Sequence, residues 1–461
     1  MNHSERGSPW AAAREGAARE ARHDDVHAPH DLGAPQAAPA CARPWAALVT
    51  ALRIALLAPP SEPVPPPGYG GTERIIAELA EGLLRRGHHV TTFCSGDSTV
   101  GGARVVTVPD ALRPSGKADS EPWKVATATM AIERSLRGEF DVIHGHLDLL
   151  TLLVAPACPV PVIATFHGRI DHKAIGLAMR GSAAHLVAIS AHQAATRPEA
   201  DWAAIIHNGL TLDGAPFERR RDDSLVFVGR VAPEKGILDA IEVAQLSGRP
   251  LRIIAKVGTH ESEAAYYRDV FEPALAAAGD SVEFLGELTG AERDQVVASS
   301  YATIMPSAWP EPFGLVAIES LACGTPVLAR RVGGLPEILR EGVDGFFGDD
   351  VRHLASLVDR VAELDREAVR ASAIDRFSAD RMVDAYESLM LRLVTGEGSG
   401  GPRAGRPQLR VAASRTLARA GLANSAHGPS AAGSADEGPA DEDPRGEVGW
   451  APDEGSAARL P

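Results

Sequence analysis

The sequence is poor in cysteine and in net positive charge, and each shortage excludes a class of protein. Four cysteines occur among 461 residues, and none forms a CxxC pair, which argues against a disulfide framework and a zinc site. Acidic side chains outnumber basic ones by 61 to 46, for a formal charge of -15. Because a protein that binds nucleic acid needs a basic face, this balance argues against a nucleic-acid partner.

Long hydrophobic runs are also missing. The longest apolar stretch, Trp45–Ala58, is shorter than the ~20 residues that a membrane-spanning helix needs, and it contains Arg53. The N-terminal region carries mixed charges and lacks the apolar segment of a signal peptide. We therefore expect a cytoplasmic protein without a transmembrane segment, for which peripheral contact with a membrane stays open.

Composition divides the chain into a central body and two tails. Residues 1–44 are rich in Ala, Arg, His and Pro, and residues 396–461 consist mainly of Gly, Ala, Pro, Ser, Asp and Glu. Such segments have too little apolar surface to offset the entropy lost on ordering, so both are predicted to be disordered. Residues 45–395 then form the folded body.

The body alternates short apolar runs with helical patterns, in two successive cycles. Apolar strands separated by helices predict parallel sheets covered on both faces. We therefore expect an α/β protein with two doubly wound domains, over residues 45–212 and 213–378, and a crossing helix over residues 379–395. Ligands of parallel sheets bind beyond the carboxyl ends of the strands, so a cleft between the domains is expected. The expected strands are 53–59, 89–94, 141–146, 160–167, 185–190, 203–207, 224–231, 251–257, 281–285, 302–306 and 326–329.

The first post-strand loop, residues 65–74 (PPPGYGGTER), is rich in glycine and lets the backbone approach a ligand closely. Thr72 is expected to cap the following helix, whose first N–H groups would attract an anion. The spacing is not GxGxxG, so a dinucleotide fingerprint is not supported. A tight turn without a ligand is the alternative.

Two loops of the second cycle carry charged residues. In residues 229–236 (GRVAPEKG), two cations lie between glycines, which suits a diphosphate, although a solvated basic loop is the alternative. In residues 309–319 (WPEPFGLVAIE), two glutamates are eight positions apart, one before a helix and one inside it. Their carboxylates can accept hydrogen bonds from paired hydroxyls, but acidic residues stabilising a helix N-terminus are an equally weighted alternative.

Together these segments resemble the retaining glycosyltransferases of family 4, which have the GT-B fold. The resemblance spans Arg53 to Leu393, with a narrower similarity of the first loop to an antibiotic-tailoring subgroup. It implies two Rossmann-like domains facing across a cleft, and transfer of a sugar from a nucleoside-diphosphate sugar to an acceptor hydroxyl. The matching segments are GYGGTER, DVIHGH, FHG, IHNGL, GRVAPEKG and EPFGLVAIESLACGTPVLARRVGGLPEIL.

The resemblance also implies how the diphosphate of the donor is held. Arg230 and Lys235 would bind it, helped by the backbone N–H groups of Gly314 and Leu315. Negative charge builds up on the leaving diphosphate in the transition state, so these groups would stabilise charge where it develops. In this family the leaving phosphate oxygen itself often takes the proton of the acceptor, and we adopt that front-face route.

The remaining implied roles concern hydroxyl groups and the reacting centre. Glu311 would bind hydroxyls of the donor sugar, and Glu319 those of the nucleotide ribose. Gly70 and Gly71 would approach the donor phosphate and the acceptor, and His167 would line the reacting centre.

No metal or other cofactor is expected. His144 and His146 have the spacing of metal ligands, but no third histidine motif accompanies them, and no DxD motif ends a strand. The expected partners are a nucleotide-sugar donor and an unidentified acceptor, which could be a saccharide, a lipid-linked sugar or a natural product. Two alternatives stay open: a non-hydrolysing sugar-nucleotide epimerase and a non-catalytic nucleotide-sugar-binding scaffold.

Deletion of residues 396–461 tests the predicted C-terminal tail. We expect activity and melting temperature to stay nearly unchanged, because a disordered segment contributes no packed surface. A large loss of either quantity would contradict the prediction of disorder.

Overall fold

The computed structural model describes residues 51–396, apart from residue 69, residues 116–119 and residues 259–260. These residues belong to one unit of the chain, Met1–Pro402, whereas a second unit, Arg403–Pro461, lies outside the described residues. The predicted tails, residues 1–44 and all but the first residue of 396–461, therefore also lie outside them.

A first parallel sheet has the strand order β3-β2-β1-β4-β5-β6-β7. Ile54 and Leu56 of β1 share a core with the buried face of α2, whereas Ala55 and Leu57 pack on the other face, in a core that includes residues of α3 and α4. Helices thus cover both faces. The strands are β1 (Arg53–Leu57), β2 (His89–Ser95), β3 (Ala103–Val108), β4 (Val142–Gly145), β5 (Val162–Thr165), β6 (His185–Ala188) and β7 (Trp202–Ile205). The helices are α2 (Gly71–Arg85), α3 (Glu121–Leu136), α4 (Leu149–Val154), α5 (Lys173–Met179) and α6 (Ala191–Ala195).

A second parallel sheet has the order β10-β9-β8-β11-β12-β13. Leu225 and Phe227 of β8 share a core with α7, and Val226 packs on the opposite face with Val297 and Ala298 of α10. The strands are β8 (Leu225–Arg230), β9 (Leu251–Lys256), β10 (Val282–Gly286), β11 (Ala302–Met305), β12 (Val327–Ala329) and β13 (Gly345–Phe347). The helices are α7 (Ile237–Ser247), α8 (Glu261–Tyr266), α9 (Glu272–Ala278), α10 (Gly290–Ser299), α11 (Leu315–Ala322), α12 (Leu335–Ile338), α13 (Val351–Leu357) and α14 (Arg366–Phe377).

The predicted fold class, two doubly wound parallel α/β domains, is therefore confirmed. Two strands were not predicted, β3 and β13, and both lie at the edge of their sheets. In β3, Arg104 and Val106 are exposed, so the strand lacks the continuous apolar run of a central strand. The three residues of β13 are buried but too few to form a recognisable pattern.

The strand order gives each sheet a switch point, where successive connections leave toward opposite edges. In the first sheet β1 pairs with both β2 and β4, and in the second sheet β8 pairs with both β9 and β11. The loops after the two strands at a switch point diverge and leave a crevice at the carboxyl ends, where ligands of such sheets bind. The glycine-rich loop follows β1, and the loops containing the charged residues follow β8 and β11.

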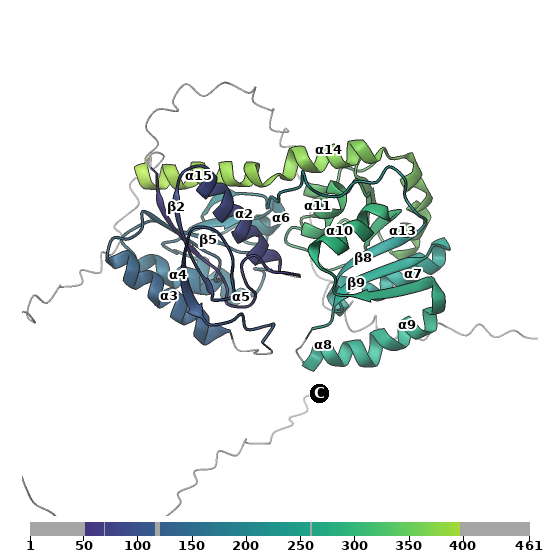
Figure 1. The fold of residues 1–461 in the computed structure, drawn as a ribbon, viewed down its shortest axis with the longest axis horizontal. Helices are drawn as coiled ribbons and strands as arrows, with labels where there is room; N and C mark the ends of the chain where they lie inside the picture. The colour runs from purple at the N-terminus through teal and green to yellow at the C-terminus, as the bar shows by residue number, and fades with distance from the viewer. Residues whose placement is uncertain (1–50, 69, 116–119, 259–260, 397–461) are drawn as a thin grey trace, which may run out of the picture. The chain divides into compact units, whose positions relative to one another are not determined.

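The last helix, α15 (Ala379–Thr395), occupies the residues predicted for the crossing helix and packs on α2 (Figure 1). Its Tyr386 is 1% exposed, and the phenol oxygen lies 3.0 Å from Thr165 Oγ1 at the end of β5. Arg86, which follows α2, donates a hydrogen bond of 2.7 Å to Asp384. These contacts hold the C-terminal helix against β5 and α2. In the described ranges, every helix is too short or too polar to cross a membrane.

Close contact between α2 and α15 depends on Gly82, where an added Cβ would lie 2.5 Å from Val383 Cγ2. We expect Gly82→Ala to lower the melting temperature, although alanine favours a helix by about 1 kcal/mol over glycine, because overpacking typically costs about 1–3 kcal/mol. Adding Val383→Ala should recover part of the loss relative to the sum of the single variants. A Gly82→Ala variant that melts higher than the wild type would contradict this packing.

Candidate functional site

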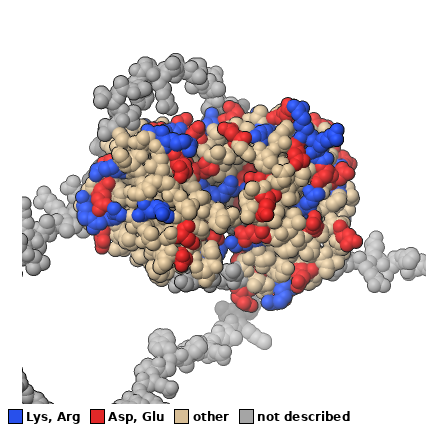
Figure 2. All heavy atoms as spheres, in the orientation of Figure 1, with Lys and Arg blue, Asp and Glu red and all other residues tan. Residues whose placement is uncertain are grey.

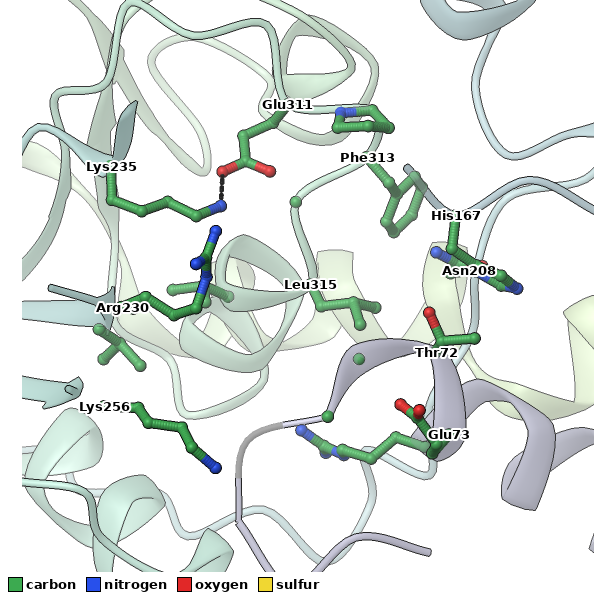
Figure 3. Close-up of a pocket in the computed structure, with 18 of the residues that line it drawn as sticks. Thr72, Glu73, His167, Asn208, Arg230, Lys235, Lys256, Glu311, Phe313 and Leu315 are labelled. Atoms are coloured by element: carbon green, nitrogen blue, oxygen red, sulfur yellow. Dashed lines mark hydrogen bonds and ion pairs between the residues drawn. The ribbon is translucent and has the colours of Figure 1, made fainter. Parts of the chain in front are cut away.

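A pocket of about 770 Å³ is lined by loops that follow strands of both sheets. Residues from the second sheet and those from the first face each other across it (Figure 3). Their convergence shows that the sequence motifs share one site, while their individual roles stay predictions. All nine residues selected from the sequence line this pocket: Gly70, Gly71, His167, Arg230, Lys235, Glu311, Gly314, Leu315 and Glu319.

Arg230 and Lys235 are held by a short turn after β8. Arg230 is the last residue of the strand, and Pro233–Lys235 form one 3₁₀ turn that ends at Gly236. The Lys235 ammonium pairs with Glu311, as the dashed line in Figure 3 shows. The Arg230 guanidinium pairs with Glu263 and, at 2.7 Å, with Glu234. Both cations therefore point into the pocket from one wall.

The loop after β11 brings Glu311 to the pocket and starts α11. Gly314 is the N-cap of this helix and has a φ of 117°, a conformation that side chains with a Cβ rarely adopt. A Cβ there would also lie 2.7 Å from Leu335 Cδ2. No side chain of the described residues caps α11, so its first N–H groups remain available to a ligand.

Glu319 lies one turn inside α11 and is 9% exposed. Its Oε1 contacts two arginines, Arg293 of α10 at 2.9 Å and Arg74 of α2. The second oxygen, Oε2, accepts no hydrogen bond from the described residues. Similarly, Lys235 bonds to Oε1 of Glu311, and no hydrogen bond of the described residues reaches Oε2. Each carboxylate thus has one oxygen held by a cation and one without a hydrogen-bond partner among the described residues.

On the first-sheet side, the glycine-rich loop leads directly into α2. The helix begins at Gly71 with Gly70 as its N-cap, and no side chain makes a capping hydrogen bond. The expectation that Thr72 caps the helix is therefore wrong, because the N-cap lies two residues earlier, at Gly70, and Thr72 lies in the first turn. The first residues of α2 line the same pocket as the first residues of α11.

His167 follows β5 and lies beside Thr72 and Asn208 (Figure 3). Its Nε2 lies 2.8 Å from Nδ1 of His146, which follows β4 and is 2% exposed. His144, inside β4, is fully buried, with its Nε2 2.8 Å from the hydroxyl of Thr165. Burial lowers the pKa of His167 to about 4 and that of His144 to about 3, so these imidazoles are uncharged near neutral pH.

The basic side chains of the pocket lie close to carboxylates. On the face in Figure 2, acidic and basic side chains are interspersed over the surface. Within the pocket, Lys256 approaches Glu287 at 3.4 Å and Glu62 at 3.5 Å, and Arg113 pairs with Glu62 at 2.9 Å. An anionic ligand must therefore compete with carboxylates for the cations of the site.

Several charged residues of the pocket were not predicted from the sequence. Lys256 ends β9 directly beside Arg230 of β8, so the rule that ligands bind beyond the carboxyl ends of strands could have found it. Arg293 lies inside α10, and only the packing of that helix beside α11 brings it to Glu319. Glu73 lies in the first turn of α2 and is 5% exposed, although the sequence carries no sign that this carboxyl is buried.

Among the described residues, no three His, Cys, Asp or Glu side chains are grouped as ligands of a metal ion. His144 and His146 do not line the pocket. The expectation that the reaction needs no metal stays a prediction.

Two family descriptions match consecutive parts of the chain. Residues 69–213 match Glycosyltransferase Family 4, and residues 214–376 match Glycosyl transferases group 1. Together they span well over half of the chain.

Curated relatives and solved structures agree with this assignment. The D-inositol 3-phosphate glycosyltransferase of Mycolicibacterium smegmatis is 29% identical over 77% of this chain and 94% of its own length. The glycogen synthase of Mycobacterium tuberculosis is 27% identical over 74% of this chain and 95% of its own length.

Two solved structures share the fold. The structure of AviGT4, a glycosyltransferase involved in avilamycin A biosynthesis, has a TM-score of 0.55 and 24% identity, over 75% of this chain and 98% of its own. Anabaena Alr3699/HepE, in complex with UDP and glucose, has a TM-score of 0.58 and 18% identity, over 74% of this chain and all of its own. With its two parallel-sheet domains and the matches along both, the chain belongs to glycosyltransferase family 4 and is a glycosyltransferase of the GT-B fold.

Proposed function

We propose that the protein is a retaining glycosyltransferase that moves a sugar from a nucleoside-diphosphate sugar to an acceptor hydroxyl. The observation that carries this proposal is the wall formed by Arg230, Lys235 and Lys256, whose side chains point into the pocket beside the start of α11 (Figure 3). Three cations and an uncapped helix N-terminus suit a diphosphate, which presents several anionic oxygens to directed donors.

The donor sugar and the ribose would bind through the two glutamates. One oxygen of Glu311 is held by Lys235, and one oxygen of Glu319 is held by Arg74 and Arg293. The other oxygen of each carboxylate can accept a hydrogen bond from a hydroxyl, Glu311 from the donor sugar and Glu319 from the ribose. Because the cations fix both carboxylates, little side-chain freedom is lost when the sugar binds.

Related proteins support the donor class. The Anabaena structure of the same fold contains UDP and glucose, which are the products of cleaving a nucleotide sugar. An epimerase is not favoured, since the matching families and the named relatives are glycosyltransferases. The alternative of a non-catalytic binding scaffold would be excluded if the protein turns over a nucleotide sugar.

The proposed chemistry follows from where charge develops. As the bond between sugar and diphosphate breaks, negative charge grows on the leaving oxygen, and Arg230, Lys235 and the N–H groups of Gly314 and Leu315 would stabilise it. We adopt a front-face route in which this oxygen takes the proton of the acceptor. Gly70 and Gly71 would let the backbone of the first domain approach the same phosphate. The side chains named here supply positive charge, so donor binding is proposed to need no metal.

The acceptor would enter beside the first sheet, where Glu73 lines the pocket. Burial raises the pKa of this carboxyl to about 7, against a smaller opposing effect of Arg113. Near neutral pH Glu73 is thus close to its titration point, while Asp148 and Lys124 on the same wall form an ion pair at 3.7 Å. This wall offers both donors and acceptors to a hydroxyl.

A thermal-shift screen without added metal tests the donor. Uridine, guanosine and adenosine diphosphates and their sugar conjugates should include one that raises the melting temperature, and Arg230→Ala and Glu319→Ala should abolish that rise. Repeating the screen with Mg²⁺ tests metal independence. Absence of any stabilisation with or without Mg²⁺ would contradict the donor site.

Lys235→Ala tests the diphosphate contact by turnover. We expect loss of most activity, on the order of 100-fold or more, because removing one donor to a developing oxyanion has effects of that size. Circular dichroism should show the fold unchanged. Lys173→Ala, which removes a lysine of α5 outside the pocket, is the matched control and should stay active. Unchanged turnover in Lys235→Ala would refute the assignment.

Glu73→Gln tests the buried carboxyl through stability. A folded-state pKa of about 7 lies above that of an unfolded glutamate, so the contribution of Glu73 to stability is fully present below the unfolded pKa and is lost as pH rises through about 7. We expect Glu73→Gln to melt higher than the wild type at pH 8 and to show a smaller difference at pH 5. The change between the two pH values should be on the order of 2 kcal/mol. Glu81→Gln, on the exposed side of α2, is the control. An equal difference at both pH values would contradict the raised pKa.

A further inference from the structure

A pair of histidines connects the pocket to the interior of the first domain. His167 lines the pocket, and its Nε2 lies 2.8 Å from Nδ1 of His146, which does not line it. The His146 ring lies against the ring of His144, with centroids 4.2 Å apart. The His146 Nε2 is buried and has no hydrogen-bond partner among the described residues.

These contacts select one tautomer of His146. Burial lowers the pKa of both rings of the pair well below the usual value, so each is neutral and carries one N–H group. A proton on Nε2 of His146 would leave a buried N–H group without an acceptor, which is rarer and costlier than a buried acceptor without a donor. The proton of His146 therefore belongs on Nδ1, where it is donated to Nε2 of His167.

The tautomer of His167 follows from that of its neighbour. If Nε2 of His167 accepts the hydrogen bond, its own proton must lie on Nδ1. This nitrogen makes no hydrogen bond to the described residues, and His167 is partly exposed toward the pocket. We propose that His146 is a positioning residue that holds His167 with its proton on Nδ1, so that His167 presents a hydrogen-bond donor to the substrate.

The role of the His167 tautomer in catalysis rests on the proposed function, which is glycosyl transfer. A nitrogen that already carries a proton cannot take the proton of the acceptor hydroxyl, so His167 would not serve as the general base at Nδ1. It would donate to an oxygen of the bound sugar and help to orient it. The proton of the acceptor would then go to the leaving phosphate oxygen, as the front-face route requires.

Nitrogen NMR of ¹⁵N-histidine-labelled protein tests the tautomer directly. Protonated and unprotonated ring nitrogens have well-separated chemical shifts, and the signals of His167 are identified by their loss in His167→Gln. We expect Nδ1 of His167 to be protonated and Nε2 unprotonated in the wild type. Protonation on Nε2 would overturn the proposal, whatever the activity of the protein.

Three variants test the role of His146. His146→Leu removes the donor with a side chain of similar bulk, and His146→Asn keeps an N–H group near the position of Nδ1. We expect Leu to give a mixture of His167 tautomers and Asn to preserve the wild-type form. His144→Leu is the matched control, because His144 is equally buried but bonds to Thr165 and not to His167.

The effect of the His146 variants on catalysis is measured by kinetics with the donor found in the thermal-shift screen. In metal sites, a partner that fixes a histidine tautomer is worth about 10–100-fold in affinity or activity, and we expect kcat to fall by the same order in His146→Leu. The Kd of the nucleoside diphosphate should not change, because His146 does not reach the pocket. His146→Asn should recover kcat and His144→Leu should keep it.

The outcomes separate this inference from the proposed function. An unchanged kcat or tautomer in His146→Leu would overturn the positioning role. If no nucleotide binds, the proposed function fails, while the NMR result still decides the tautomer. If His146→Leu does not fold, the wild-type spectrum and His146→Asn carry the test.

Discussion

The site depends on the order of strands in the second sheet, where β8 lies between β9 and β11. Connections leave these strands toward opposite edges, so the loops after β8 and β11 diverge and their backbones can surround a ligand. Arg230 and Lys235 follow β8, Glu311 and the start of α11 follow β11, and Lys256 ends β9 beside Arg230. Residues that are far apart in the chain thus meet because parallel strands bring their carboxyl ends to one edge.

The pocket balances its charges internally. Lys235, which is proposed to bind the diphosphate, pairs with Glu311, and Arg293 pairs with Glu319. Cations therefore hold both carboxylates that are proposed to bind hydroxyl groups. A cation in a partly buried site is costly unless it is paired, and these pairs reduce that cost. They leave the second oxygen of each carboxylate without a hydrogen-bond partner among the described residues. The same side chains therefore serve the stability of the site and its proposed selectivity for a nucleotide sugar.

Much of the fold could be predicted from residues alone. The apolar runs of central strands are continuous because both faces of the sheets are covered, and this pattern identified β1, β8 and β11. Of the edge strands, β3 and β13 were not predicted, because β3 is half exposed and β13 is short. The predicted capping role of Thr72 was wrong, since α2 begins at Gly71. A capping residue is assigned from local chemistry, whereas the start of a helix also depends on how the chain enters it.

The sequence by itself determined the two-domain α/β class, the glycosyltransferase family and nine of the residues that line the pocket, because glycine-rich and charged post-strand loops are local in the chain. Only the tertiary structure decided which atoms meet. The pairing of Glu319 with Arg74 and Arg293 joins residues from separate elements, and the burial of Glu73 arises from the packing around α2. The bond between His146 and His167 requires the ends of β4 and β5 to lie side by side. Burial and hydrogen-bond partners are properties of packed neighbours, and the order of residues along the chain does not specify them.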